Sequence, residues 1–374
     1  MKVLVTGGAG FIGTHLCRKL LADSHAVSVV DNFSPQVHAG NCDLALDIRP
    51  DVKLIRGDVR DKSCLVASLA GQDAVIHLAA ETGTGQSMYE VAHYGEVNLG
   101  GTALLLEQLV KQPAGDIETI IVASSRAVYG EGRYVCDEHG VQFPDARLKA
   151  DMLKKQFQPV CPQCGCEMEA VPTTEDSMLH PTSFYGLTKL TQEQMTLMFG
   201  RALGLRAFGL RFQNVYGPGQ SLNNPYTGIL PVFSNQARFG KPIYIFEDGA
   251  ESRDFVYVQD VCNATVACLT APVVVEALNV GSGRQTTVLE IAQKVVDYFG
   301  SKSEIFVNGA FRIGDVRHSL ADLGRVRSRL AFEPQWSFSE GLLRFLEWSA
   351  DEKPQHVGYE ESFQEMSARN MYHA

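Results

Sequence analysis

Short apolar runs alternate with amphipathic stretches over the first third of the chain. The apolar runs are residues 3–5, 26–30, 54–59, 74–80 and 120–125. Strands that are buried on both faces of a parallel sheet read as continuous apolar runs, whereas the helices between them carry one apolar face. The pattern up to Gly130 therefore predicts an α/β fold of Rossmann type, with a doubly wound parallel sheet.

The rhythm changes after Gly130. The residues that follow are rich in Cys, Pro, Glu and Asp, which indicates an insertion with a small fold of its own. A helical pattern then returns at 185–203, and an apolar run at 206–212. The division that we expect is a first domain of residues 1–130 and 178–222, with returns near 254–269 and 278–281; a Cys-rich insertion at 131–177; a smaller C-terminal α/β lobe, mainly 223–350; and a polar, loosely ordered tail at 351–374.

Composition narrows the classes of protein. The chain has 374 residues, of which 45% are hydrophobic, so it can bury a large core in two lobes. Its net charge of -10 argues against a nucleic-acid partner, and no run of eighteen apolar residues predicts a membrane span. Because the first strand-like run begins at Lys2, we expect no secretion signal and a cytoplasmic protein. The nine cysteines then indicate reduced thiols or a metal site rather than disulfides.

A glycine-rich turn joins the first apolar run to the first helical stretch. Its glycines, Gly7, Gly10 and Gly13, recur at every third position. Small residues let the backbone approach a pyrophosphate, and the amides at the start of a helix bind it. This turn predicts a dinucleotide site that includes Phe11 and Ile12.

Asp31 and Asn32 end the second apolar run. A carboxylate at this point can accept both ribose hydroxyls of an adenosine, and it repels the additional phosphate of NADP. The simpler interpretation is that Asp31 caps a turn. Its distance from the glycines favours the cofactor role, so we expect tightly bound NAD.

Three residues form a candidate catalytic group. Ser125 ends the run at 120–125, and Tyr185 and Lys189 lie four residues apart on one face of the predicted helix. A phenol is a poor base at neutral pH, and an adjacent cation lowers its pKa. Ser125 would hydrogen-bond the substrate oxygen during proton transfer. A Tyr-x-x-x-Lys pair on a helix surface is common, but here it follows a nucleotide-binding half and has Ser125 as its partner.

In combination these motifs resemble the extended short-chain dehydrogenases, the family of NAD-dependent nucleotide-sugar epimerases and dehydratases. The resemblance covers about residues 1–350, and its pieces occur in the family's order. The matching segments are residues 6–13, 31–32, 58–59, 77–80, 98, 124–130, 185–189, 211–218, 253–255, 279–281 and 312–315.

The resemblance implies roles for further residues. It implies that Ser125, Tyr185 and Lys189 carry out the chemistry. It also implies a homodimer that forms through the helices near 102–109 and 186–203. Arg253 and Arg312 suit a sugar diphosphate, although each has a neighbouring aspartate as an alternative partner. The implied NAD contacts are Asp58, Val59, Leu78, Ala79, Ala80, Asn98, Tyr185, Lys189 and Phe212, and the implied contacts to the sugar diphosphate are Ser125, Tyr185, Asn214, Arg253, Arg312 and Asp315.

The reaction is narrowed by two positions. Dehydratase members carry an acid/base pair directly after the catalytic hydroxyl, where this chain has Arg126 and Ala127. We therefore expect a 4-epimerase, which oxidises C4 transiently to a 4-keto sugar and reduces it again on the opposite face. Segments 81–88 and 219–228 and the Cys-rich insertion resemble the branch that interconverts dTDP-L-rhamnose and dTDP-6-deoxy-L-talose.

Other functions stay open at this point. UDP-glucose or UDP-glucuronate 4-epimerase is the second interpretation, and CDP-tyvelose 2-epimerase is the third. An NAD-sensing regulator would be expected to have lost the tyrosine or the lysine, and both are present. The insertion could also serve as an interaction module.

The insertion itself carries two pairs of metal-ligand type. Cys136 and His139 form one pair, and Cys161 and Cys164 form the other. Two such pairs suit a closed tetrahedral zinc site, so we expect a zinc ribbon with structural zinc. Free thiols in a solvated loop are the alternative, and Cys166 is a rival ligand.

Overall fold

The structure is a computed structural model of the chain. It describes residues 1–38, 40–112, 116–222, 228–272, 274–353 and 359–373. The expected start of the smaller lobe at 223, and part of the 219–228 segment, fall at residues 223–227 and so lie outside the described residues.

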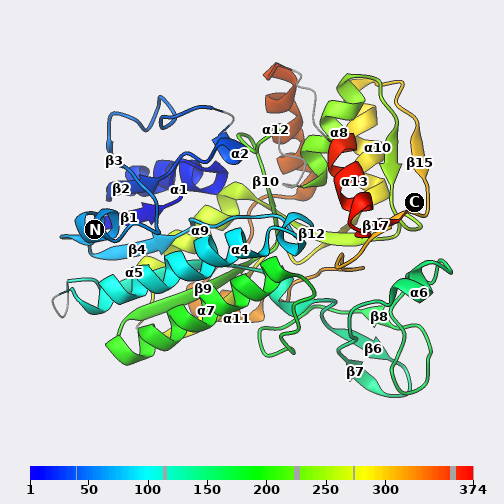
Figure 1. Ribbon diagram of the computed structural model, residues 1–374, viewed down its shortest axis with the longest axis horizontal. Coiled ribbons are helices and arrows are strands. Elements are labelled where there is room, and N and C mark those ends of the chain that lie inside the picture. The colour runs from blue at the N-terminus through cyan, green and yellow to red at the C-terminus, as the bar shows by residue number, and fades with distance from the viewer. Residues whose placement is uncertain (39, 113–115, 223–227, 273, 354–358, 374) are drawn as a thin grey trace.

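A seven-stranded parallel sheet forms the larger lobe (Figure 1). Its order is β13 (Val275–Val280), β9 (Arg206–Phe212), β5 (Thr119–Ser125), β4 (Ala74–His77), β1 (Lys2–Thr6), β2 (Ala26–Asp31) and β3 (Val52–Arg56). The strand order reverses at β1, which lies between β2 and β4, and ligands bind outside the carboxyl ends of strands at such a point. The predicted doubly wound α/β fold is therefore confirmed.

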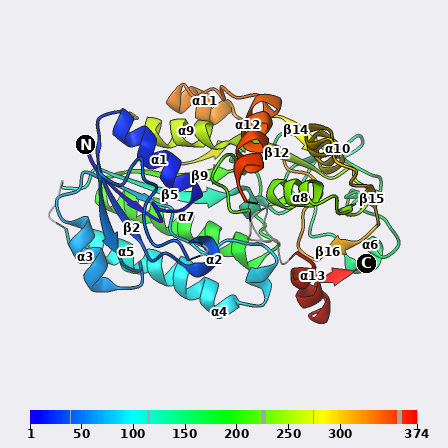
Figure 2. The same ribbon diagram turned by 90° about the horizontal axis from the view of Figure 1, so that it is seen from above.

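Helices cover both faces of this sheet, as Figure 2 shows from above. One face carries α1 (Phe11–Ala22), α9 (Val258–Thr270) and α11 (Gly324–Leu330). The other carries α3 (Lys62–Leu69), α5 (Gly101–Val110) and α7 (Phe184–Leu203). The strands are buried from both sides, which explains their continuous apolar runs. Two short helices, α2 (Pro35–His38) and α4 (Val91–Tyr94), lie near the carboxyl edge.

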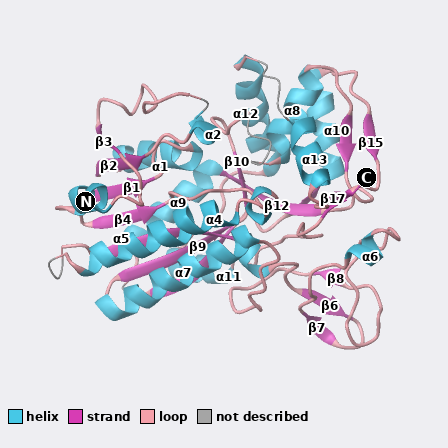
Figure 3. Ribbon diagram, in the orientation of Figure 1, coloured by secondary structure: helices cyan, strands magenta, loops and turns pink. Residues whose placement is uncertain are grey.

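A smaller lobe packs its helices on short sheets (Figure 3). One sheet joins β10 (Asn214–Tyr216), β12 (Ser252–Tyr257) and β14 (Gln285–Thr287), and another joins β11 (Ile243–Ile245) to β15 (Ile305–Val307). The helices are α8 (Ile229–Arg238), α10 (Val288–Phe299) and α12 (Phe338–Asp351). Their apolar faces and the sheets share one buried cluster.

The insertion folds as a small antiparallel sheet of β7 (Gly140–Gln142), β6 (Tyr134–Cys136) and β8 (Glu169–Ala170), with the short helix α6 (Lys149–Met152). Its own apolar cluster holds few large side chains, mainly those of Tyr134 and Met168. Met152 and Phe157 pack instead on Phe311 of the smaller lobe. The insertion therefore depends on something other than a large core.

The tail differs from the loose order that its polar composition indicates. It contains α13 (Tyr359–Ala368) and β17 (Tyr372–His373), and β17 pairs antiparallel with β16 (Phe311–Arg312). Met366 is buried, although it is one of few large apolar residues in the tail. Strand pairing, the burial of Met366 and a hydrogen bond from Tyr89 to Glu365 explain the order of the described tail residues. Among the described residues, no helix is both long and apolar enough to span a membrane.

Candidate active site

One cavity of about 1010 Å³ opens at the carboxyl ends of the parallel strands and extends to the smaller lobe. It brings together nearly all of the predicted cofactor, catalytic and substrate residues. Those that line it are Gly7, Gly10, Phe11, Ile12, Gly13, Asp31, Asn32, Asp58, Val59, Leu78, Ala79, Ala80, Ser125, Tyr185, Lys189, Phe212, Asn214, Arg253, Arg312 and Asp315.

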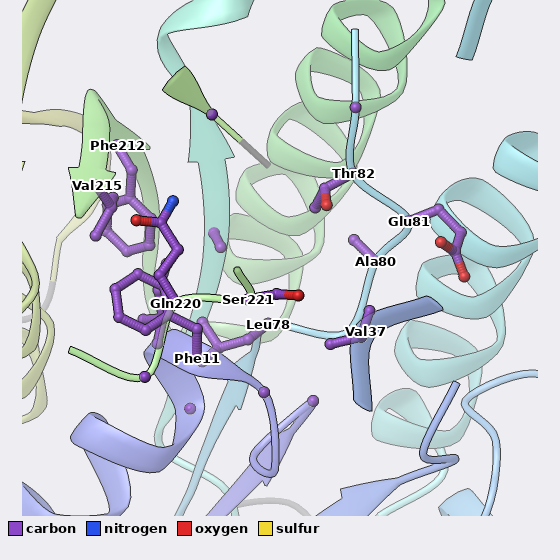
Figure 4. Close-up of a pocket in the computed structure, with 18 of the residues that line it drawn as sticks. Phe11, Val37, Leu78, Ala80, Glu81, Thr82, Phe212, Val215, Gln220 and Ser221 are labelled. Atoms are coloured by element: carbon purple, nitrogen blue, oxygen red, sulfur yellow. The ribbon is translucent and has the colours of Figure 1, made fainter. Parts of the chain in front are cut away.

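The glycine turn shapes the end of the cavity in the larger lobe. Gly7 has a φ of +70°, and a Cβ atom there would lie 2.8 Å from the backbone nitrogen of Ala79. At Gly13, a Cβ would lie 2.4 Å from the carbonyl oxygen of Gly7. The turn thus holds the start of α1 against the ends of β1 and β4, in the geometry that suits a pyrophosphate. Figure 4 shows Phe11 and Phe212 on one side of this end and Val37 on the other.

Asp31 lines the same end and also fixes the turn after β2. One carboxylate oxygen accepts a hydrogen bond from the Ala9 amide at 3.0 Å, and the other accepts one from the Phe33 amide at 2.9 Å. His38, which the sequence did not point to, lies 3.3 Å from the carboxylate. Each carboxylate oxygen can accept more than one hydrogen bond, so the ribose role and the turn role are compatible.

Asn32 and Asp58 lie side by side at the edge of this end. The Asn32 side-chain amide donates to Asp58 at 2.9 Å. Hydrogen bonds from Arg60 hold the pKa of the Asp58 carboxyl well below its usual range, so this carboxyl is ionised at neutral pH.

Asn98 does not line the cavity. It lies in a π-helical turn, Gly95–Gly100, and its side chain accepts from the Glu81 amide at 2.8 Å and donates to Thr188 at 3.0 Å. It thereby ties the loop after β4 to α7. Turns of this kind occur often at functional sites, and here the turn positions the cavity wall.

Ser125 and Tyr185 meet between the two ends of the cavity. Ser125 ends β5, and its hydroxyl oxygen accepts the Ala127 amide at 3.1 Å, which starts a short 3₁₀ turn, Arg126–Tyr129. Tyr185 lies in the first turn of α7, which Ser183 caps by accepting the Gly186 amide at 3.1 Å. Both side chains line the cavity, and Ser125 lies near enough to the Tyr185 phenol to act on its pKa.

Lys189 lies one helical turn further on. Its ammonium donates to the Ala123 carbonyl at 3.0 Å and lies 5.9 Å from the centre of the Tyr185 ring. Burial lowers the pKa of Lys189 to about 7. Burial raises the pKa of the Tyr185 phenol, whereas the Ser125 hydrogen bond and the positive charge of Arg126 lower it. The cation that acts on the pKa of the phenol is thus Arg126, whereas the spacing of the sequence indicated Lys189.

Two arginines line the smaller-lobe end. Arg253 is buried and donates to the carbonyl oxygens of Ser252 and Arg317, each at 2.9 Å. It forms no ion pair with Asp254, whose carboxylate accepts instead from the Ser282 amide and hydroxyl and from nearby amides. This arrangement leaves the rest of the Arg253 guanidinium at the cavity.

Arg312 does pair with its neighbouring aspartate. The distance from its Nε to a carboxylate oxygen of Asp315 is 2.7 Å, and its guanidinium lies over the Phe246 ring. Although burial acts to raise it, Arg312 and Arg253 hold the pKa of Asp315 below its ordinary value. Arg312 therefore forms the ion pair and also lines the cavity.

Several charged lining residues have no role assigned from the sequence, and two of them lie near the catalytic and sugar residues. Arg126 lines the cavity rather than facing bulk solvent. Glu251 also lines it, and burial raises the pKa of its carboxyl to about 7, although Arg253 acts in the opposite direction. Glu251 lies two residues before Arg253, so it would have been found by extending the matching segment at 253–255 towards the N-terminus.

The insertion gathers the four predicted metal ligands. The ligand atoms of Cys136, His139, Cys161 and Cys164 all lie within 4.8 Å of one another. Cys136 and Cys164 have their sulfurs 3.6 Å apart, and each of Cys136 and Cys161 lies 3.6 Å from the His139 ring nitrogen. Zinc with ordinary bond lengths in a tetrahedron places ligand atoms about 3.6 to 3.8 Å apart, so the cluster fits. Cys166 is exposed and is not part of the cluster.

Residues 3–147 and 161–281 match the profile of the NAD dependent epimerase/dehydratase family. The chain belongs to this family. The predicted resemblance is thereby confirmed, and the protein is an enzyme of the NAD-dependent nucleotide-sugar epimerase family.

Similar proteins cover nearly the whole chain. The dTDP-L-rhamnose 4-epimerase of Burkholderia thailandensis is 41% identical over 355 residues, which are 94% of this chain and 95% of that protein. UDP-glucose 4-epimerase of Thermotoga maritima, solved with UDP-glucose, has a TM-score of 0.74 at 29% identity and covers 93% of this chain and 98% of its own. MoeE5, solved with UDP-glucuronic acid and NAD, has a TM-score of 0.74 at 30% identity and covers 94% and 99%.

Proposed function

We propose that the protein is a 4-epimerase that interconverts dTDP-L-rhamnose and dTDP-6-deoxy-L-talose. The observation that carries the proposal is that Ser125, Tyr185 and Lys189 line one cavity together with the glycine turn. The 41% identity with the Burkholderia thailandensis enzyme supports this sugar over the UDP-sugars of the other relatives.

The lining residues divide the work. Bound NAD supplies hydride acceptance and donation at the sugar carbon. Tyr185 takes the proton of the C4 hydroxyl and later returns it, and Ser125 hydrogen-bonds the same oxygen. Lys189 lies one helical turn from the phenol and donates to the Ala123 carbonyl. Arg253 and Arg312 offer guanidinium groups that suit the two charges of a diphosphate.

Epimerisation fits better than dehydration. Elimination of water needs an acid/base pair next to the reacting carbons, and Arg126 and Ala127 follow Ser125 in this chain. We expect no 4-keto-6-deoxy product from dTDP-glucose or CDP-glucose.

A substrate panel tests the proposal. Purified protein is incubated with dTDP-, UDP-, CDP- and GDP-sugars, and the products are resolved by NMR. We expect dTDP-6-deoxy-L-talose from dTDP-L-rhamnose, and NAD released on denaturing the protein. Faster turnover of UDP-glucose, UDP-glucuronate or CDP-tyvelose would instead identify one of the other sugars, and an alkali-induced ketosugar absorbance would overturn the exclusion of dehydration.

We also propose that Cys136, His139, Cys161 and Cys164 hold one structural zinc ion. The insertion has few large apolar side chains, so metal binding would supply the stability that its core cannot. Elemental analysis of protein purified without chelator should give near one zinc per chain. Cys161→Ser should lower the zinc content and leave the NAD content unchanged, whereas Cys166→Ser, the matched control, should retain zinc. Metal-free wild-type protein with an ordered insertion would contradict the proposal.

We further propose a homodimer through α5 and α7. Leu187 and Met198 of α7 are 46% and 56% exposed, which is a large apolar exposure for one helix. Sedimentation should give the dimer mass for the wild type and a weaker dimer for Met198→Glu. A wild-type monomer at micromolar concentrations would exclude this arrangement.

A further inference from the structure

Arg126 is a cation at the cavity without an anionic partner in the protein. It directly follows Ser125, and its Nε donates to the side-chain oxygen of Asn214 at 2.8 Å. Within the described part of the chain, no carboxylate forms an ion pair with it, and Asp315 is already paired with Arg312. An arginine has five N–H donors in a fixed fork, so several donors of Arg126 are left to face the cavity.

The burial of this cation costs free energy. Removing a charge from water without a counter-charge is unfavourable, and burial lowers the pKa of Arg126 to about 10, with Arg253 adding to the effect. The guanidinium still carries its charge at neutral pH. Negative charge that forms beside it during the reaction would be stabilised strongly, because the site is already desolvated.

The reaction proposed above forms such charge at one place. Tyr185 must be a phenolate to take the sugar hydroxyl proton, and this proton later returns to the sugar oxygen. Lys189 alone stabilises the phenolate only weakly, because its ammonium donates to the Ala123 carbonyl and loses its proton near pH 7. Arg126 stays positive over this range and acts electrostatically on Tyr185.

We propose that Arg126 is a further catalytic residue, whose guanidinium stabilises the Tyr185 phenolate and the developing charge on the C4 oxygen. This role rests on the proposed epimerase function. Asn214 orients the guanidinium through its hydrogen bond, which leaves the fork directed at the cavity. Where dehydratase members carry an acid/base group, this chain thus has the permanent positive charge of Arg126. Such a charge suits proton transfer at one oxygen and does not suit elimination.

The phenol titration tests the pairing without any substrate. Tyrosines are labelled with ¹³C at Cζ in NAD-bound protein, and the Tyr185 signal is assigned with Tyr185→Phe. An opposite charge at close range lowers a pKa by about 1–3 units, so Arg126→Met should raise the Tyr185 midpoint by at least about one pH unit. Arg126→Lys should restore part of it, and Arg344→Met, which removes an exposed arginine, should leave it unchanged. An unchanged midpoint in Arg126→Met would overturn the proposal.

Turnover tests the catalytic part with whichever nucleotide sugar the wild type accepts. Arg126→Met should lower kcat at pH 7 by about 10- to 100-fold and move the acid limb of the kcat profile upward, with KM changed by less than about threefold. A tenfold rise in KM at unchanged kcat would mean that Arg126 binds a substrate anion, such as a sugar carboxylate, and would also overturn the proposal. If the wild type turns over no nucleotide sugar, the proposed function is wrong. The titration then still tests whether Arg126 acts on Tyr185.

Discussion

The two ends of the cavity obtain their shape from different sources. At the cofactor end, the backbone determines the shape: Gly7 lies too close to the segment after β4 for a Cβ atom, and Gly13 lies too close to Gly7 and Gly8 of the turn. At the sugar end, charged side chains determine the shape: Arg253 lies on β12, and Asp315 lies outside the helices and strands. A site that is shaped by the backbone forms together with the sheet. A site that is shaped by charged side chains needs further charged residues to hold those side chains in place.

Arg147 of the insertion supplies part of that support. Its Nε donates to Glu131 at 2.8 Å, one terminal nitrogen donates to Glu247 at 2.7 Å, and the other donates to the Asp315 carbonyl at 2.8 Å. The side chains of Arg147, Glu131 and Glu247 are 6%, 1% and 2% exposed. The insertion therefore reaches the segment that carries Asp315 through a buried ion-pair network.

Arg317 closes the network from the other side. Its amide donates to Glu131 at 2.8 Å, and its guanidinium donates to Glu247 at 2.7 Å. Its carbonyl accepts from Arg253 at 2.9 Å. Two arginines, two glutamates and Asp248, which Arg317 also pairs with at 2.7 Å, thus form one network that supports both sides of the sugar end.

The largest effect is expected where the two ends meet. Tyr185→Phe removes the proton acceptor and leaves the glycine turn intact, so turnover should fall by about 10²–10⁴-fold while NAD stays bound. Steady-state kinetics and the NAD content of the purified variant check this. Tyr298→Phe, on the exposed face of α10, is the control and should match the wild type. Turnover of Tyr185→Phe within threefold of the wild type would contradict the assigned role.

The same contrast explains what the sequence could predict. Strand ends and glycine spacing are local signals, so the parallel sheet and the turn from Gly7 to Gly13 could be predicted. The network at the sugar end could not, because Arg147 and Glu247 are 100 residues apart and buried charges have no period. The resemblance implies an NAD contact for Asn98, and the motif could not predict the π-helical turn in which its side chain bonds to Glu81 and Thr188.

The second-largest effect is expected from a substitution that disturbs the sugar end alone. Arg147→Met leaves Glu131 and Glu247 buried with less positive charge, and breaking a buried pair costs about 3–5 kcal/mol of the free energy of unfolding. We expect a lower urea midpoint, a higher KM for the nucleotide sugar and unchanged NAD content. Arg147→Lys should recover part of the KM, because it restores the charge without the fork. Arg133→Met, an arginine of the insertion outside the network, is the control. Equal losses of sugar and NAD binding would show that the two ends are not separately supported.

A smaller effect is expected from a substitution that disturbs the cofactor end alone. Gly7→Ala places a Cβ 2.8 Å from the Ala79 nitrogen at a φ of +70°. Strain of this kind costs about 1–3 kcal/mol, and we expect the variant to lose NAD during purification while still binding zinc. Gly204→Ala has a similar φ of +69° but no neighbour within 4 Å, so it separates backbone strain from the collision. If both variants keep NAD equally well, close approach of the backbone does not shape this end.

The smallest effect is one that both ends should share. His77 of β4 lies between the hydroxyls of Thr6 and Thr102 at 2.7 and 2.9 Å, and burial lowers its pKa to about 3. At the sugar end, burial and Arg317 lower the pKa of His318 to about 4. Both rings are neutral in the folded protein at pH 5, whereas a histidine of the unfolded chain takes up a proton below about pH 6.5. The unfolded state then binds more protons, so stability falls as the pH drops below 6.5, and this loss is absent above that pH. For His77 the loss of stability approaches about 1.4 kcal/mol per pH unit.

Urea unfolding of wild type, His77→Gln and His318→Gln at pH 7.5, 6.0 and 5.0 measures this loss of stability. Each variant is expected to lose stability less steeply between pH 6.0 and 5.0, whatever its stability at pH 7.5. Slopes equal to that of the wild type in both variants would mean that neither histidine makes its end of the cavity sensitive to acid.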